Sequence, residues 1–260
     1  MEIVFDVRKT ADENASSFFE ASKKAKKKLA GAEMAVGKTR LQLQSLLKKQ
    51  ELEGVENKER AGKKQERKWY EKFRWFVSSE GFLCIGGRDA ASNEILVKKH
   101  AEKGDIVFHT EISGSPFFVI KADGREIGQA TLEEAGVATA SFSRVWKLGL
   151  SHAEVFHVKP EQLSKTPKAG EYLEKGSFIV NGHANKQMAE VKLAVGAAKD
   201  GTIMCGPVAA VRKNCSRYLE IGHGNNKTSD VAKKIKKKLG GEIDDIARAL
   251  PSGGVMLTHV

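Results

Sequence analysis

The chain has few cysteines and no long apolar run, and both shortages limit what it can be. Its three cysteines, Cys84, Cys205 and Cys215, are widely spaced in 260 residues and fit neither a disulfide framework nor a CxxC metal site. No apolar run is long enough to span a membrane, and the N-terminal stretch mixes acids and lysines with short apolar runs, unlike a signal peptide. We therefore expect a cytoplasmic protein with reduced, structural thiols and no membrane partner.

Familiar catalytic and nucleotide-binding motifs are also absent. The sequence holds no GxSxG nucleophile elbow. The GGRD turn at 86–89 matches neither GxGxxG nor GxxxxGK[ST], and Asp89 places a carboxylate where a phosphate would lie. His100, His109 and Glu111 match no familiar metal-ligand spacing. The sequence favours a binding protein that is not an enzyme and has no cofactor or metal; a small-anion or nucleotide enzyme built on the GGRD turn is a competing hypothesis.

Positive charge gathers at two places in a chain whose net charge is +11. Residues 10–75 hold 17 Lys and Arg against 10 Asp and Glu, whereas residues 76–226 hold 18 against 17. Residues 227–239, KTSDVAKKIKKKL, hold six lysines and one aspartate. Two basic elements thus flank a nearly neutral region, as expected for contact with a polyanion such as RNA. A solvated charged face is the alternative for both elements.

The first basic element has the heptad pattern of a coiled coil. Steps of four and three residues from Phe18 to Gln50 give ten positions, seven of them apolar, and lysines fill most of the opposite faces. EGVENK at 53–58 supplies a glycine break, after which KKQERKWYEKFRWF resumes helical spacing. We therefore expect a basic coiled-coil hairpin over residues 1–68 and a second domain over residues 69–260.

The second domain is predicted to be α+β, with a mixed or antiparallel sheet and flanking helices. GFLCI has strand character, and Asp89 is placed to cap the helix that follows. KGDIVFHTE and SPFFVIK predict two more strands, and a helix is predicted from 129 to 147, opened by a capping box of Thr131 and Glu134. Alternating apolar runs and turn residues from 176 to 222 predict an antiparallel meander, and IDDIARAL and VMLTHV predict a final helix and strand.

The lysine-rich segment predicts an amphipathic helix capped by Thr228 or Ser229. Val231, Ile235 and Leu239 are four residues apart and can bury one face, which leaves the lysines outward. Trp146 is expected in the core, and pairing with a nearby acid is the alternative role for Arg88. The side chains expected to contact RNA are Arg88, Lys98, Lys99, His109, Arg144, Lys147, Lys165, Lys168, Lys233, Lys234, Lys236, Lys237 and Lys238.

Several long motifs resemble one known family. They are WYEKFRWFVSSEGFLCIGGRDAASNEILVKKH at 69–100, GDIVFHTEISGSPFFVIK at 104–121, SFSRVWK at 141–147, PEQLSK at 160–165, GEYLEKGSF at 170–178 and LPSGG at 250–254. In this order they resemble the archaeal form of the NFACT-R domain, found at the C-terminal end of the NEMF/RqcH/FbpA group. The start, FDVRKTADENASSFFEASKKAKKKLAGAE, resembles the segment that leads into the coiled coil of those proteins.

The resemblance implies a role in ribosome-associated quality control. Proteins similar to this one bind the large ribosomal subunit obstructed by peptidyl-tRNA, recognise tRNA and promote C-terminal alanine tailing, while the ribosome performs the peptide-bond chemistry. The family's NFACT-N domain is not found in this sequence, so we expect a C-terminal half, which is a fragment or is joined in trans by an NFACT-N-containing protein. The alternative is a protein-interaction module that docks such a protein or a ribosomal protein without binding RNA.

Overall fold

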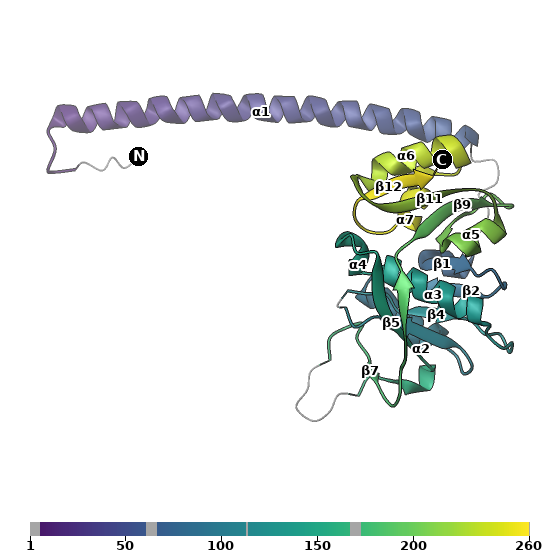
Figure 1. Ribbon diagram of the computed structural model, residues 1–260. Helices are drawn as coiled ribbons and strands as arrows, with labels where there is room; N and C mark the ends of the chain where they lie inside the picture. Colours follow the sequence, from purple (N-terminus) through teal and green to yellow (C-terminus); the bar gives the residue numbers. More distant parts are fainter. Residues whose placement is uncertain (1–5, 61–66, 113, 167–172, 260) are drawn as a thin grey trace. The chain divides into compact units, whose positions relative to one another are not determined.

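The computed structural model describes residues 6–60, 67–112, 114–166 and 173–259, with side chains over 6–45, 67–112, 114–166 and 173–258. The chain divides into two compact units, Met1–Glu66 and Arg67–Val260 (Figure 1). In the described part of the chain, no helix combines the length and the apolar character needed to cross a membrane.

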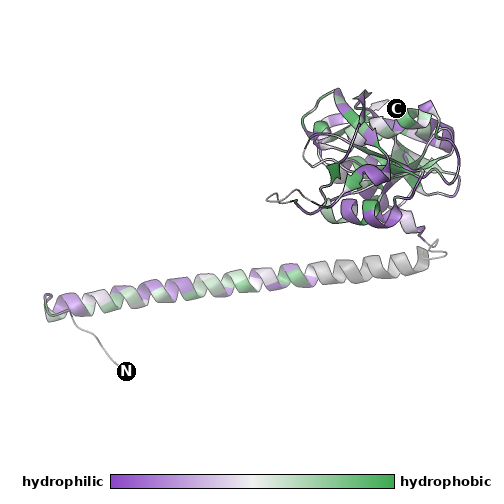
Figure 2. Cartoon of the chain, turned by 90° about the horizontal axis from the view of Figure 1, so that it is seen from below, coloured by the Kyte–Doolittle hydropathy of each residue, from purple (hydrophilic) through white to green (hydrophobic). Residues whose placement is uncertain are grey.

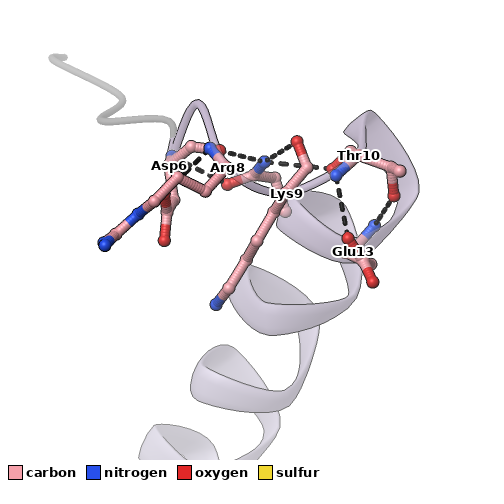
Figure 3. Close-up of polar contacts among 6 residues, drawn as sticks. Asp6, Arg8, Lys9, Thr10 and Glu13 are labelled. Atoms are coloured by element: carbon pink, nitrogen blue, oxygen red, sulfur yellow. Dashed lines mark hydrogen bonds and ion pairs between the residues drawn. The ribbon is translucent and has the colours of Figure 1, made fainter.

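The first unit is a single helix, α1 (Ala11–Arg60), whose first turn is closed by local hydrogen bonds. The Glu13 N–H donates to Thr10 Oγ1 at 3.2 Å, and the Thr10 N–H donates to Glu13 Oε2 at 2.8 Å (Figure 3). This reciprocal pair is a capping box, which satisfies N–H groups that a helix start leaves without partners. The buried Asn14 amide also donates to the Asp6 carbonyl at 3.1 Å and so fixes the chain that enters the helix.

The predicted helical hairpin is wrong, because α1 continues without interruption through residues 53–58. One interior glycine costs a helix only about 1 kcal/mol relative to alanine, too little to end a helix of 50 residues. The predicted second arm also fails, since Trp69–Lys72 is a 3₁₀ turn, η1, followed by strand β1 (Arg74–Val77). Phe73 and Phe76, which suggested one helix face, are buried in two separate cores.

The second unit is built on a six-stranded antiparallel sheet, which confirms the α+β class. Its order is β1-β2-β4-β3-β5-β8. Alternate residues point to opposite faces, so Ile85 and Val119 enter one core while Cys84 and Phe118 enter the other. The further strands of this sheet are β2 (Leu83–Gly86), β3 (Ile106–His109), β4 (Phe118–Ile120), β5 (His152–Val158) and β8 (Asn185–Glu190).

Helices and a second sheet cover the two faces. Helix α2 (Ala90–His100), predicted as a helix after Asp89, buries Leu96 and Val97 in the smaller core. The larger core lies between the six-stranded sheet and the remaining elements, which include the antiparallel sheet β10-β9-β11-β12 (Figure 1). These elements are α3 (Gln129–Ser141), α4 (Arg144–Lys147), β9 (Leu193–Ala198), β10 (Ile203–Gly206), α5 (Val208–Asn214), β11 (Cys215–Asn226), α6 (Thr228–Leu239), α7 (Ile243–Ala249) and β12 (Val255–His259).

The predicted meander is confirmed only in part. Strands β9, β10 and β11 are antiparallel neighbours, but α5 interrupts them. Strand β8 belongs to the six-stranded sheet, and β7 (Ile179–Val180) pairs with β6 (Leu163–Ser164) after a short 3₁₀ turn, η2 (Pro160–Gln162). The segment therefore links three sheets.

Two predicted helix caps are wrong, and at α3 other segments supply the hydrogen bonds. Helix α3 has Gly128 at its N-cap, and the Thr131 N–H donates to Glu80 at 2.9 Å while Glu134 accepts from the Ser79 N–H at 2.9 Å. At α6 the N-cap is Lys227, which makes no side-chain capping bond. The predicted helix from 129 to 147 is also split, since α3 and α4 are separate.

The glycine pair of the GGRD turn gives room for packing. A Cβ on Gly86 would overlap the ring of Phe118, and a Cβ on Gly87 would overlap the side chain of Asn93. That buried amide accepts from the Phe117 N–H at 3.1 Å and so fixes the start of α2 to the sheet. The two glycines thus let a strand, a ring and a helix approach closely.

A buried ion pair joins Lys121, which directly follows β4, to Asp105, which directly precedes β3. Lys121 Nζ lies 2.6 Å from Asp105 Oδ2, with side chains only 8% and 3% exposed. Burial opposes the charged form of Lys121, but the hydrogen bonds that its ammonium donates to Asp105 and Glu102 outweigh burial and hold its pKa above the ordinary value. The ammonium also donates to the His100 carbonyl at 2.9 Å, which joins the C-terminus of α2 to β4.

We predict that Lys121→Met lowers the free energy of unfolding by about 3 to 5 kcal/mol, because the Asp105 carboxylate stays buried without its partner. Urea denaturation at neutral pH measures the change. The control is Lys186→Met, whose exposed partners Glu111 and Glu154 lie at 2.8 and 3.0 Å; such pairs contribute at most about 1 kcal/mol. Equal losses in the two variants would contradict the prediction.

Candidate nucleic-acid interface

Helix α6 presents most of its lysines to solvent. Val231, Ile235 and Leu239 are buried, as predicted, and the helix lies on the second sheet through them (Figure 1). On the outer side Lys233 lies 3.6 Å from Asp230 and Lys236 lies 3.5 Å from Glu242. Among the described residues no acid pairs with the other three lysines, which we call the α6 lysine face: Lys234, Lys237 and Lys238.

An arginine from a neighbouring strand extends this face. Arg217 on β11 donates to the carbonyls of Lys238 and Leu239 at 3.3 and 3.4 Å. These are the last carbonyls of α6, where the helix dipole favours a cation. Three lysines spaced three and four residues apart repel one another, and the arginine adds a further cation beside them. Sequence reasoning missed Arg217, because only the sheet brings it to the end of α6.

A second basic pair lies on α4. Arg144 and Lys147 are exposed, while Trp146 between them is fully buried, as predicted. The Trp146 indole donates to the Gly254 carbonyl at 3.0 Å, and the side chain of Lys147 lies against Gly253. Thr228, the first residue of α6, donates to the Gly253 carbonyl at 3.1 Å. One loop therefore brings the predicted residues of α4 close to the start of α6.

The side chain of Arg88 joins backbone segments of the second unit to one another. Its guanidinium donates to the carbonyls of Lys72, Phe73 and Arg248 at 3.0, 2.8 and 2.5 Å, so it holds backbone and not an acid. Burial and then the charge of Arg248 lower its pKa to about 10, which leaves it charged at neutral pH. Three donors are thus engaged within the protein, and an RNA contact by Arg88 stays a prediction.

The N-terminus of α2 is already occupied by a carboxylate. Asp89 Oδ1 accepts from the Ser92 N–H at 2.7 Å, and Ser92 Oγ accepts from the Asp89 N–H at 2.9 Å. These hydrogen bonds lower the pKa of Asp89, which keeps the negative charge in place. A helix start capped in this way repels a phosphate, so the geometry weighs against the nucleotide-enzyme hypothesis.

His109 is mostly enclosed by aromatic rings. Its imidazole stacks on Phe117 with centroids 4.0 Å apart and meets the edge of Phe156 at 5.9 Å. Burial lowers its pKa to about 4, against weaker opposing interactions of the imidazole with the backbone of Ser115 and Thr110. The ring is therefore neutral at physiological pH and adds no charge to a phosphate contact.

The other residues predicted to contact RNA differ in whether an acidic side chain pairs with them. Lys98 pairs with Glu94 at 2.6 Å, and Lys165 lies 3.5 Å from the same carboxylate and over the ring of Phe178. Lys99 is exposed and has no acidic partner in the described part of the chain. Lys168 lies outside the described residues. Of the residues predicted to contact RNA, those that are exposed and have no acidic partner in the described part of the chain are Lys99, Arg144, Lys147, Lys234, Lys237 and Lys238.

A protein-family model matches part of the chain. Residues 72–182 match the model described as the NFACT protein RNA binding domain. This stretch includes Arg88, Arg144 and Lys147 and ends before α6. The resemblance stated from the sequence motifs is thereby confirmed.

Curated relatives extend the similarity beyond that stretch. The chain is 42% identical over 198 residues to the archaeal Rqc2 homolog aRqcH of Methanocaldococcus jannaschii, an alignment covering 74% of this chain and 29% of that protein. It is 38% identical over 179 residues to the ribosome quality control complex subunit NEMF of Homo sapiens, covering 66% and 16%. The Drosophila melanogaster homolog of NEMF is 37% identical over 69% of this chain and 18% of its own. The chain thus spans less than a third of these relatives.

One solved structure is also similar. The C-terminal part of the fibronectin/fibrinogen-binding protein from Streptococcus suis aligns over 51% of this chain and 48% of its own, at 21% identity and a TM-score of 0.38. This likeness is too slight to define the fold.

We predict that His109 makes the fold less stable in acid. Below pH 6.5 the unfolded chain binds a proton at this histidine, whereas the folded chain does so only near pH 4. Stability from this group is therefore complete above about pH 6.5 and falls as the pH drops toward 4. Between pH 7 and 4.5 the loss in free energy of unfolding should be smaller in His109→Phe than in the wild type by about 2 to 3 kcal/mol. Urea titrations at both pH values measure it, and identical losses would contradict it.

Proposed function

We propose that this chain, whose residues 72–182 form an NFACT-type RNA-binding domain, is an RNA-binding component of ribosome-associated quality control. In this proposal it binds tRNA and the ribosomal RNA of the obstructed large subunit in the cytoplasm, and so supports rescue of stalled chains and their alanine tailing. The human and Drosophila relatives are named as ribosome quality control complex subunits, which supports the pathway. The chain itself supplies binding, and the ribosome performs the chemistry.

The extent of the similarity sets the limits of the proposal. Alignments cover 29% of the archaeal relative and 16% of the human one, so most of each relative has no counterpart here. Activities of the whole relatives therefore need further segments. An NFACT-N-containing protein acting in trans is one source, as the sequence motifs implied.

The α6 lysine face is the observation that carries the proposal. Lys234, Lys237 and Lys238 share one side of a helix, lack acidic partners among the described residues and lie beside Arg217. A concentration of one sign costs free energy through self-repulsion, and a polyanion relieves that repulsion. Lysines that neutralise phosphates release counterions, which gives binding a steep dependence on salt.

Arg144 and Lys147 are proposed as a second part of the same surface. They lie on α4, and both α4 and the start of α6 contact Gly253. A folded RNA presents phosphates over a broad area and is recognised mainly by its shape. Two basic helices fixed to one loop suit such a target better than an isolated charged segment does.

A second candidate function rests on α1. Its heptad positions Leu29, Val36 and Leu43 are 61%, 67% and 56% exposed. Figure 2 shows hydrophobic residues distributed among hydrophilic ones along this helix. An apolar heptad stripe is the surface that another helix covers in a coiled coil. In this alternative, α1 docks an NFACT-N-containing protein or a ribosomal protein, and the charge serves solubility.

We predict that the Lys234→Gln/Lys237→Gln double variant binds tRNA and isolated large subunits more weakly than the wild type. Its plot of log affinity against log salt should be shallower by roughly 1.5 to 2, since two phosphate contacts are lost. The charge-matched control is Lys186→Gln/Lys192→Gln, which removes two exposed lysines that already pair with acids. Binding titrations over a salt series measure all three proteins.

The outcomes separate the two candidates. An equal loss in both variants would show that net charge, and not the α6 lysine face, determines affinity. If the wild type binds neither RNA target at low salt but retains a protein partner at high salt, the interaction function replaces the RNA-binding one.

A further inference from the structure

An exposed tryptophan stacks on a histidine at the start of the second unit. Trp69 in η1 is 48% exposed, although large aromatic side chains are mostly buried. Its indole lies against the imidazole of His100, with ring centroids 4.5 Å apart and planes at 21°. The histidine covers one face of the indole, and the Tyr70 ring meets the indole at 81° with centroids 5.8 Å apart, yet about half of the side chain stays exposed.

The stacked pair is held by well-ordered neighbours. His100 is the last residue of α2, and its carbonyl accepts from the buried Lys121 ammonium at 2.9 Å. Its ring also meets the edge of Phe73 at 5.6 Å. The 3₁₀ turn that carries Trp69 is closed by the Phe73 N–H, which donates to the Tyr70 carbonyl at 2.9 Å. A ligand that stacked on Trp69 would meet a surface already ordered, which reduces the entropy lost on binding.

Two exposed lysines are close in sequence to the stacked pair, Lys72 in η1 and Lys99 beside His100 in α2. Lys72 and Lys99 are exposed, and neither pairs with an acid among the described residues. Lys72 Nζ lies over the Phe73 ring, 5.1 Å from its centroid, and Phe73 in turn meets His100. Burial and then the charges of Lys72, Lys121 and Lys99 lower the pKa of His100, against the opposing charge of Glu102. His100 is therefore neutral at physiological pH, and the site combines an uncharged aromatic surface with two exposed lysines that have no acidic partner among the described residues.

We propose that an unpaired base of a single-stranded RNA segment stacks on the exposed face of Trp69, while Lys72 and Lys99 neutralise the neighbouring phosphates. Any base offers a flat face to an indole, and aromatic rings set among lysines are the usual platform for single strands. A duplex keeps its bases stacked on one another and has none to offer. This inference rests on the proposed RNA-binding function and adds the kind of RNA and its contact.

The experiment measures affinity for a short single-stranded RNA and for a duplex of the same sequence, at one salt concentration. Trp69→Ala should weaken single-strand binding roughly 5- to 150-fold, the loss expected for one stacked base, and leave duplex binding unchanged. Trp69→Phe should retain most of the affinity. Ile95→Ala is the matched control, because it removes another exposed apolar side chain, 41% exposed, from α2. Circular dichroism checks that each variant is folded.

The possible results test the stacking contact and the proposed function separately. A loss of less than twofold in Trp69→Ala, or equal losses for single strand and duplex, would overturn the stacking contact. If tRNA still binds with a steep salt dependence in that case, the proposed function stands without it. If no RNA binds to any of the proteins, both proposals fail. Loss of a protein partner in Trp69→Ala, with single-strand affinity unchanged, would assign the surface to protein binding and overturn the inference.

Discussion

The arrangement of the second unit depends on hydrogen bonds to the carbonyl oxygens of one short segment, residues 248–254. Arg88 donates to the Arg248 carbonyl, the buried Arg74 donates to the Leu250 carbonyl at 3.1 Å, and Trp146 donates to the Gly254 carbonyl. Thr228 adds the bond to Gly253 that fixes the start of α6. A carbonyl that is buried without a donor is costly, as the Leu250 carbonyl would be without Arg74, and the four bonds together join the first sheet, α4 and α6 to one segment. The positions of the basic surfaces relative to one another follow from this segment.

Local patterns predicted most single elements correctly, because near neighbours decide them. Strand β2, helix α2 with its Asp89 cap and the buried face of α6 all follow from residue spacing. The failures involve partners distant in sequence. Glu80 replaces the predicted cap of α3, and the spacing of Phe73 and Phe76 imitates a helix while each enters a different core. A glycine at 54 does not end α1, since its cost is spread over a long helix.

Partners distant in sequence also decide which basic residues are available to bind a phosphate. Sequence shows where lysines and arginines are numerous but not which of them already have partners. Lys98 and Lys236 are paired with acids, Arg88 is turned toward backbone carbonyls, and Arg217, absent from the predicted set, lies at the end of α6. An exposed cation attracts a phosphate more strongly when no carboxylate lies beside it. The structure thus reduces a long list of basic residues to a few that are free to bind.

The GGRD turn shows why a resemblance to a phosphate-binding loop is misleading here. In such loops glycines bring backbone N–H groups close to the ligand and a helix start faces the anion. Here Phe118 and Asn93 fill the space beside Gly86 and Gly87, and Asp89 places its own negative charge at the helix start. The turn's one cation, Arg88, points into the protein. Since this turn is filled and capped, it offers no backbone N–H cradle to a phosphate, and the proposed RNA contacts therefore rest on exposed lysine and aromatic side chains instead.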